Sequence, residues 1–429
     1  MTGSIALVVF GTLIVCLVLT VPIGFSLGIA SLSYILYTKQ LTFGFIAQNL
    51  VTGADSFPTM AIPFFVFAGE LMGGGGISRR LLSVANVFFG RIRGGLAIVT
   101  VVVCMFFAAI SGSGPATVAA VGGMVVPTML EKGYDKKFIL ALLAAAGSIG
   151  VIIPPSIPMV IYSVTTNSSV SKLFMAGLIP GIMIGLVLIA YCYYYARKQG
   201  YKGDTEPFSW RRAGKEAWLA KWALFSPVII LGGIYGGIFT PTEAAAVSVI
   251  YSLVIGCFVY KELNWKNLLT VTKNSCETTA TILIVIGCAA GFSKVLTLGR
   301  IPTTVAAFMT SLTDSKILIL LLINVLLLIV GCFMETLCAI MILAPILYPV
   351  VTSMGVDAVH FGIIMVVNLA IGFITPPLGV NLFVASRVGE TTLDTVIKGI
   401  VPFLILMIGV LMLITYIPAI SLFLPSIFA

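Results

Sequence analysis

Two proline pairs lie inside apolar segments at matching places in the two halves of this 429-residue chain. The segment 144–159 reads AAAGSIGVIIPPSIPM, and the segment 368–381 reads NLAIGFITPPLGVN. Consecutive prolines remove backbone donors and prevent an α-helix from continuing, so each segment is predicted to be a broken helix. At bilayer depth, such a break needs protein or a watery cavity around its polar groups. Each break is therefore a candidate binding site.

The two halves keep one spacing well beyond the prolines. Five pairs of identical residues are each separated by 222 positions (for the first pair, 349 − 127 = 222). They are Pro127 and Pro349, Gly133 and Gly355, Asp135 and Asp357, Gly150 and Gly372, and Pro154 and Pro376. Matched breaks in repeated halves are typical of secondary transporters, which bind substrate between the repeats. We therefore expect an inverted repeat.

Hydrophobic residues make up 59% of the chain and charged residues 9%, whereas a soluble domain carries about 25% charged residues. The fold class is predicted to be an all-α polytopic membrane protein with two re-entrant helical hairpins and two broken helices. We expect a scaffold helix and connecting arm over 1–56 and a first repeat over 57–198, with a hairpin at about 94–132 and a broken helix at about 136–163. A linker over 199–221 and scaffold helices over 222–276 would follow. The second repeat, over 277–429, would contain a hairpin at about 316–350, a broken helix at about 357–386 and a C-terminal helix. The first apolar run is read as one long helix, kinked near Pro22 and continuing to Tyr37.

The net charge of +9 comes from loops between apolar runs. The densest basic group is Arg197, Lys198, Lys202, Arg211, Arg212, Lys215 and Lys221. The positive-inside rule places this linker in the cytoplasm, and the segment 208–221 is predicted to be an interfacial helix. Basic and aromatic residues do not alternate as they do in nucleic-acid-binding surfaces. The eight cysteines form no CxxC motif, so metal and disulfide roles are not expected.

The polar sequence ISGSGPATVAA interrupts the first predicted hairpin. Ser113 followed by Pro115 is a good helix start, and its free N–H groups would suit an anion. The matching place in the second half reads GCFMETLCA and contains Glu335. An ionised carboxylate within a bilayer costs several kcal/mol unless it is paired or solvated, so Glu335 is a functional candidate. Pairing with an Arg or Lys is the structural alternative.

Several other polar residues are expected to have structural roles. Asp55 is read as the cap of a helix beginning near Phe57, with a transport role as the alternative. Thr242 is read as the cap of the helix that follows FTPTEAAAV, with Glu243 facing the dipole. His360, the only histidine, is read as solvated at the interface, with a proton relay as the alternative. Lys294 and Arg300 would snorkel to the surface or pair with Glu70 or Glu277.

The two hairpin tips and the two breaks supply hydroxyl and carbonyl oxygens at the membrane midplane. Sodium prefers such ligands, and helix N-termini receive carboxylates. The pattern predicts two Na⁺ sites on either side of one anion site. No GxxxxGK[ST] motif for ATP binding is present.

Five motifs carry a resemblance to a known family: GADSFPTMAIPFFVFAGELM, SGSGPATVAAVGGMVVPTM, GSIGVIIPPSIPMVIY, FTPTEAAAV and LAIGFITPPLGVNLFVAS. Together they resemble the large membrane subunit of tripartite ATP-independent periplasmic (TRAP) transporters, nearly from end to end. The resemblance implies an elevator, in which a transport domain holding both hairpins slides along a fixed scaffold. It also implies Na⁺-coupled uptake with a separate small four-helix membrane subunit and a periplasmic binding protein, in the bacterial inner membrane.

The resemblance also implies the site residues. Sodium would be bound by Ser111, Ser113, Gly114, Ser148, Gly150, Pro154, Glu335, Thr336, Gly372 and Thr375. The substrate cavity would involve Ser111, Ser113, Ser156, Pro158 and Glu335.

The chain is expected to be a carrier and not an enzyme. The sialic acid members resemble it most, so sialic acid is the predicted substrate, and a C4-dicarboxylate or another carboxylate carried with Na⁺ or H⁺ is the alternative. An intramembrane hydrolase with Ser113 as its nucleophile is the alternative from another class. The GxSG pattern of such hydrolases would need a glycine at position 111, where this chain has Ser111. A channel is the third alternative.

Overall fold

The computed structural model describes residues 2–39, 41–203, 208–313 and 315–428, and every regular element within them is a helix. The first five helices are α1 (Thr2–Val18), α2 (Ile23–Thr38), α3 (Phe43–Ala54), α4 (Ala61–Gly74) and α5 (Ile77–Phe89). The first repeat continues with α6 (Gly95–Ser111), α7 (Gly114–Glu131), α8 (Lys136–Ser148), α9 (Ile157–Thr166) and α10 (Val170–Gln199).

The second half begins with α11 (Trp210–Tyr235), α12 (Pro241–Val254), α13 (Trp265–Leu298) and α14 (Ile301–Leu312). It ends with α15 (Lys316–Phe333), α16 (Thr336–Ser353), α17 (Ala358–Gly372), α18 (Val380–Val388), α19 (Leu393–Tyr416) and α20 (Ala419–Ile427). Seven helices in the described residues are long and apolar enough to cross a membrane, and α3 with α4 makes a further span if the bent pair, with its 61° break, counts as one. The predicted all-helical, polytopic fold class is confirmed.

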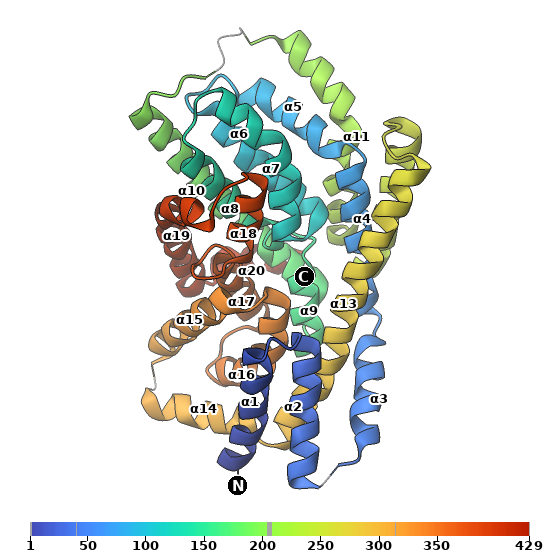
Figure 1. The fold of residues 1–429 in the computed structure, drawn as a ribbon, viewed down its shortest axis with the longest axis vertical. Coiled ribbons are helices and arrows are strands. Elements are labelled where there is room, and N and C mark those ends of the chain that lie inside the picture. Colours follow the sequence, from blue (N-terminus) through green and yellow to red (C-terminus); the bar gives the residue numbers. More distant parts are fainter. Residues whose placement is uncertain (1, 40, 204–207, 314, 429) are drawn as a thin grey trace.

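Both proline pairs interrupt helices. The first break separates α8 from α9, and the second separates α17 from α18; both Pro154–Pro155 and Pro376–Pro377 are cis. Asp135 and Asp357, one repeat interval apart, cap α8 and α17 by accepting hydrogen bonds from backbone N–H groups. Figure 1 places the hairpin α6–α7 in the upper half and the hairpin α15–α16 in the lower half, with α9 and α17 between them.

The N-terminal region is a helical hairpin, so the prediction of one long kinked helix to Tyr37 is wrong. The chain reverses between Val18 and Ile23, and α2 packs against α1 (Figure 1). Thr20 adopts a left-handed conformation with φ of 59°. Pro22 follows with extended backbone and directs the chain into α2.

Two predicted helix caps are also wrong. Asp55 ends α3 instead of starting the next helix, and its backbone N–H donates to the Val51 carbonyl. Thr240, not Thr242, caps α12, because Thr240 forms a capping box with Glu243. The Thr242 hydroxyl donates instead to the carbonyl oxygen of Phe57 at 3.1 Å, which ties α12 to the start of α4.

The linker helix does not end at Lys221. Ser209 caps a single helix, α11, that runs to Tyr235, so the amphipathic segment continues directly into a membrane span. Lys221 Nζ lies 3.4 Å from the ring centroid of Trp218, an arrangement that suits an aromatic and basic belt at the headgroups.

His360 is buried, with 2% of its surface exposed, so the prediction of a solvated position is wrong. Its Nδ1 lies 2.6 Å from the Ser421 hydroxyl, and its Nε2 lies 3.3 Å from the Thr415 carbonyl oxygen. These contacts attach the last two helices to α17. Glu277 pairs with Lys273 at 3.8 Å, so the suggested pairing of Glu277 with Lys294 or Arg300 is also wrong.

Candidate functional site

The tips of the two hairpins meet at one cavity of about 700 Å³. We define this tip cavity by Ser111 and Ser113 from the first tip and Glu335 and Thr336 from the second. The start of α9, at Pro158, forms another part of its wall. Residues 222 positions apart therefore come together in space, as the repeat spacing predicted.

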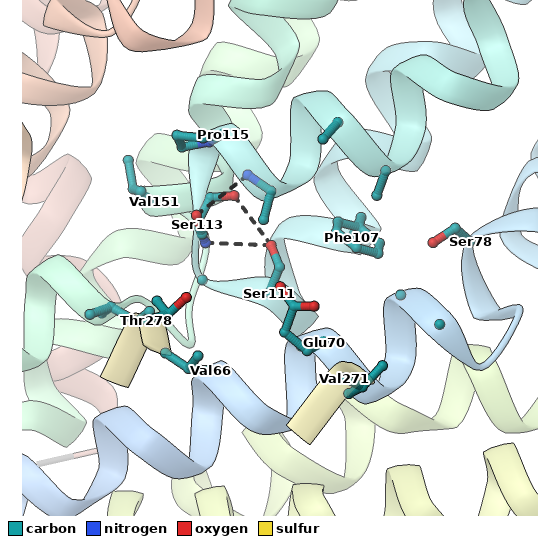
Figure 2. A pocket seen from close by; sticks show the side chains of 18 of the residues that line it. Val66, Glu70, Ser78, Phe107, Ser111, Ser113, Pro115, Val151, Val271 and Thr278 are labelled. Atoms are coloured by element: carbon teal, nitrogen blue, oxygen red, sulfur yellow. Dashed lines mark hydrogen bonds between the residues drawn. The ribbon is translucent and has the colours of Figure 1, made fainter. Parts of the chain in front are cut away.

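The first tip is a compact cluster of oxygen atoms. The chain leaves α6 at Ser111, passes Gly112 in a left-handed conformation and enters α7 at Gly114. Ser113 caps α7, since its hydroxyl accepts a hydrogen bond from the backbone N–H of Ala116. The Ser111 hydroxyl lies 3.3 Å from the Ser113 carbonyl oxygen (Figure 2).

Thr117 completes this cluster, one turn into α7. Its hydroxyl is buried, lies 3.0 Å from the Ser111 hydroxyl and donates to the Ser113 carbonyl at 2.7 Å. Thr117 belongs to the polar sequence ISGSGPATVAA, but it is not among the predicted ligands. Its spacing of four residues after Ser113 is the helical signal that brings the two groups together.

The first tip packs against the first break. A Cβ atom on Gly150 would lie 2.6 Å from both the Ser113 carbonyl oxygen and the Thr117 hydroxyl, so only glycine permits this approach. On the other side, a Cβ atom on Gly114 would lie 3.3 Å from Oδ1 of Asn381. That amide oxygen is fully buried and has no hydrogen-bond partner in the described residues.

The second tip differs from the first in its chemistry. Glu335 is at the capping position of α16 but makes no side-chain capping bond. It also makes no ion pair with a described residue, so the alternative of structural pairing is not supported. The Thr336 hydroxyl is buried and has no hydrogen-bond partner among the described residues. Backbone contact between Gly331 and Gly372 joins this tip to the second break, since a Cβ atom on Gly372 would lie 2.6 Å from Gly331.

Glu335 also faces a second cavity of about 350 Å³ on its other side, which Arg387 lines. The carboxylate therefore lies between two open volumes. Water or ions in these volumes can solvate it, which is the condition that its position within the membrane requires.

The remaining predicted residues lie behind the tips. The Ser148 hydroxyl donates to the Ala145 carbonyl, and that of Thr375 donates to the Ile371 carbonyl. The fully buried Ser156 caps α9 and donates across the break to the Val151 carbonyl at 2.6 Å, and it does not line the tip cavity. Pro154 and Gly372 also lie outside the lining. Because neither has a polar side chain, each could supply only backbone groups to a neighbouring ion site.

The other wall of the tip cavity comes from α4 and α13. Gly69 allows close packing here, because a Cβ atom on it would lie 3.1 Å from Cα of Ser111. The half-buried Glu70 therefore lies beside Ser111, as Figure 2 shows. Arg79 and Thr278 also line the cavity and were not predicted, because nothing local in the sequence marks them.

These donors fit a hard monovalent cation better than a transition metal. The described residues contain no group of three or more His, Cys, Asp or Glu side chains that could hold a metal ion. Hydroxyl and carbonyl oxygens dominate both tips, and the buried oxygens of Asn381 and Thr336 have no hydrogen-bond partner among the residues that the structure describes. Oxygen donors of this kind suit Na⁺, and helix N-termini suit an anion.

Comparison with known proteins decides the family. The family model described as "Tripartite ATP-independent periplasmic transporter, DctM component" matches residues 10–420. The chain belongs to the DctM family. Together with the apolar spans, membership places this DctM protein in the bacterial inner membrane as a multi-pass permease, a class that is not enzymatic.

Relatives cover almost the whole chain. An isethionate TRAP transporter permease protein, DctMQ, of Oleidesulfovibrio alaskensis is 52% identical over 97% of this chain, which spans 66% of that protein's length. A C4-dicarboxylate TRAP transporter large permease protein of Pseudomonas aeruginosa is 44% identical, with 94% of each chain covered. A sialic acid TRAP transporter large permease protein of Vibrio cholerae is 38% identical over 95% of both.

Solved structures support the fold alone. The YdaH transporter of Alcanivorax borkumensis aligns with a TM-score of 0.59 at 17% identity, covering 86% of each chain. MtrF of Neisseria gonorrhoeae aligns with a TM-score of 0.55 at 14% identity, covering 86% of this chain and 83% of its own.

Proposed function

We propose that this chain is the sodium-coupled permease subunit of an uptake system for a small organic anion. A small membrane subunit and a periplasmic binding protein would complete the system. The observation that carries the proposal is the meeting of both hairpin tips, with Ser111, Ser113, Glu335 and Thr336, at a single cavity. Oxygen ligands at the tips would bind Na⁺, and the charge of the bound ions would then attract the anion.

The energetics of this coupling are sufficient without ATP. If two Na⁺ ions accompany a monoanion, one net charge enters and supplies about 2.3 kcal/mol per 100 mV of membrane potential. A tenfold Na⁺ gradient adds about 1.4 kcal/mol per ion. The sum of about 5 kcal/mol would concentrate the substrate several thousand-fold.

We infer that the substrate is a small organic monoanion, with isethionate as the first candidate. The 52% identical relative is named for isethionate. The lining of the tip cavity also favours a single negative charge, because three carboxylates, those of Glu70, Glu262 and Glu335, line it with only one basic residue, Arg79, among the described residues. Of these carboxylates, that of Glu262 is paired with Arg80. A C4-dicarboxylate is the second candidate, since relatives with 44% and 41% identity carry that name. Sialic acid stays a weaker prediction, from relatives at 38% and 37% identity.

We also infer an elevator movement. Close glycine contacts attach each tip to its own break, so each hairpin and break would move together, while α4 and α13 would form the fixed wall. Such rigid packing resists continuous deformation and favours movement as a unit.

Uptake in proteoliposomes tests the proposal. The permease, its small subunit and its binding protein would be reconstituted, and isethionate, succinate and sialic acid compared under an inward Na⁺ gradient. We expect uptake of isethionate that disappears when K⁺ replaces Na⁺ at the same membrane potential. Uptake driven by a pH gradient without Na⁺ would overturn the coupling. Counterflow separates a carrier from a channel, because only a carrier exchanges labelled for unlabelled substrate.

A further inference from the structure

A third cavity of about 340 Å³ lies between α3, α4, α9, α13 and α16. We call it the Lys294 cavity, after the one charged residue that lines it within the described part of the chain. Its polar lining residues are Thr52, Ser56, Thr165, Asn167, Ser293, Lys294 and Thr297.

Three of these side chains are available to a ligand. Thr52, Thr165 and Thr297 donate to carbonyl groups of their own helices, and the Ser56 hydroxyl lies 2.6 Å from the Thr59 hydroxyl. In contrast, the side chains of Asn167, Ser293 and Lys294 make no hydrogen bond or ion pair with any residue that the structure describes. The lining contains an ammonium, an amide and a hydroxyl but no carboxylate, so it suits an anion.

The Lys294 cavity and the tip cavity are stacked along the same helices. Four helices line both, and on each helix the nearest lining residues are one turn apart: Val66 and Ile62 on α4, Pro158 and Ile161 on α9, Ile282 and Ile286 on α13, and Leu337 and Met341 on α16. A turn is 3.6 residues and rises about 5.4 Å. The two cavities are therefore separated by a layer about one helical turn thick.

Apolar, buried side chains make up this layer. Phe65 of α4 is 2% exposed, while Met159 and Val160 of α9 and Ile340 of α16 are 0% exposed. An anion cannot cross such a layer without losing its hydration. The layer thus closes the path between the cavities in this conformation.

The charge pattern assigns the two cavities to opposite sides of the membrane. The basic linker before α11 marks the cytoplasmic side. Since α11 and α12 cross and return, α13 starts at the cytoplasmic side with Trp265 and ends at the periplasmic side with Leu298. The tip cavity uses the first part of α13, and the Lys294 cavity uses its last part.

We propose that the Lys294 cavity is the periplasmic receiving site for the organic anion, with Lys294 as its charged contact and Ser293 and Asn167 as hydrogen-bond donors. This rests on the proposed function. The anion delivered from outside would first meet these side chains and would reach the hairpin tips when the layer of α9 and α16 moves past α4 and α13.

Cysteine modification tests the site independently of transport. Ser293→Cys would be introduced together with Cys276→Ala, because Cys276 is exposed. The reconstituted complex would be treated from outside with an anionic and a cationic methanethiosulfonate reagent. We expect Lys294→Gln to lower the anionic-to-cationic ratio of reaction rates about tenfold, and added salt to weaken this effect. Lys273→Gln, the same charge change near the other end of α13, should leave the ratio unchanged.

Transport gives the second readout. At low ionic strength, Lys294→Gln should raise the apparent KM for labelled isethionate about tenfold, whereas Lys294→Arg should keep it near that of the wild type. An unchanged reaction ratio overturns the receiving site, and so does an unchanged KM in a protein with normal Na⁺-dependent uptake. Failure of the wild type to take up any anion with Na⁺ would instead overturn the proposed function.

Discussion

The backbone at Gly150 lies so close to Ser113 that a methyl group on Gly150 would come within 2.6 Å of the Ser113 carbonyl oxygen. This contact joins the tip of the first hairpin to the break that follows α8. It brings the carbonyl and hydroxyl oxygens of the tip next to the irregular backbone of the break, which is the arrangement that the proposed Na⁺ site requires.

We expect Gly150→Ala to separate these two segments. Overpacking of this kind costs about 1–3 kcal/mol, and here it also displaces the oxygens of the candidate ion site. Thermal unfolding in detergent should shift to lower temperature, and the Na⁺ concentration for half-maximal uptake should rise. Gly123→Ala on α7 is the matched control, because a Cβ atom there meets no atom within 4 Å. Equal Na⁺ dependence in both variants would contradict the prediction.

Ser111→Ala and Glu335→Gln should each abolish uptake while leaving the protein folded. Each change removes an oxygen ligand or a charge from the tip cavity, and neither removes a partner from a described ion pair. Uptake and size-exclusion profiles would be measured on the same preparations. Full uptake by either variant would discard that residue's role in binding.

Arg80 and Glu262 should contribute measurably to stability. Arg80 donates to Glu262 at 2.7 Å and lies 3.6 Å from the ring centroid of Tyr260, so it holds the start of α5 against the loop before α13. A double-mutant cycle with Arg80→Gln and Glu262→Gln should give a coupling free energy of about 1 kcal/mol. The exposed pair Lys273 and Glu277 is the control and should give at most about 0.5 kcal/mol. Equal coupling in the two cycles would go against this role.

His360→Ala should loosen the C-terminal helices. The change removes the imidazole partner of the buried Ser421 hydroxyl, which keeps its hydrogen bond to the Pro418 carbonyl, so we expect a loss of about 1 kcal/mol. Thermal unfolding in detergent is the measurement. Ser426→Ala, which changes an exposed hydroxyl bonded within its own helix, should unfold like the wild type. The prediction fails if the two variants unfold at the same temperature.

The sequence predicted those features that depend on local chemistry or on the repeat. Ser113 caps its helix as expected, and Ser113 and Glu335, which the interval of 222 positions relates to each other, line the same cavity. Proline pairs break helices wherever they occur, so both breaks could be located.

Features that depend on contacts between distant segments could not be predicted in this way. The reversal at Thr20 uses a left-handed residue that is not glycine, so no local signal marks it. His360 follows a capping aspartate and reads as a surface residue, but α20 covers it. Asn381 has its oxygen beside Gly114, more than 260 positions earlier in the chain (381 − 114 = 267), and only the fold brings these two residues together.

The length of α13 has a consequence for the surrounding lipid. Its 34 residues extend about 51 Å, whereas the hydrocarbon core of a bilayer is about 30 Å thick. In Figure 1 α13 runs obliquely past α2. If the proposed elevator movement follows α13, the moving body travels sideways as well as inward. Each turnover would then displace neighbouring acyl chains, and the rate of transport would depend on their length.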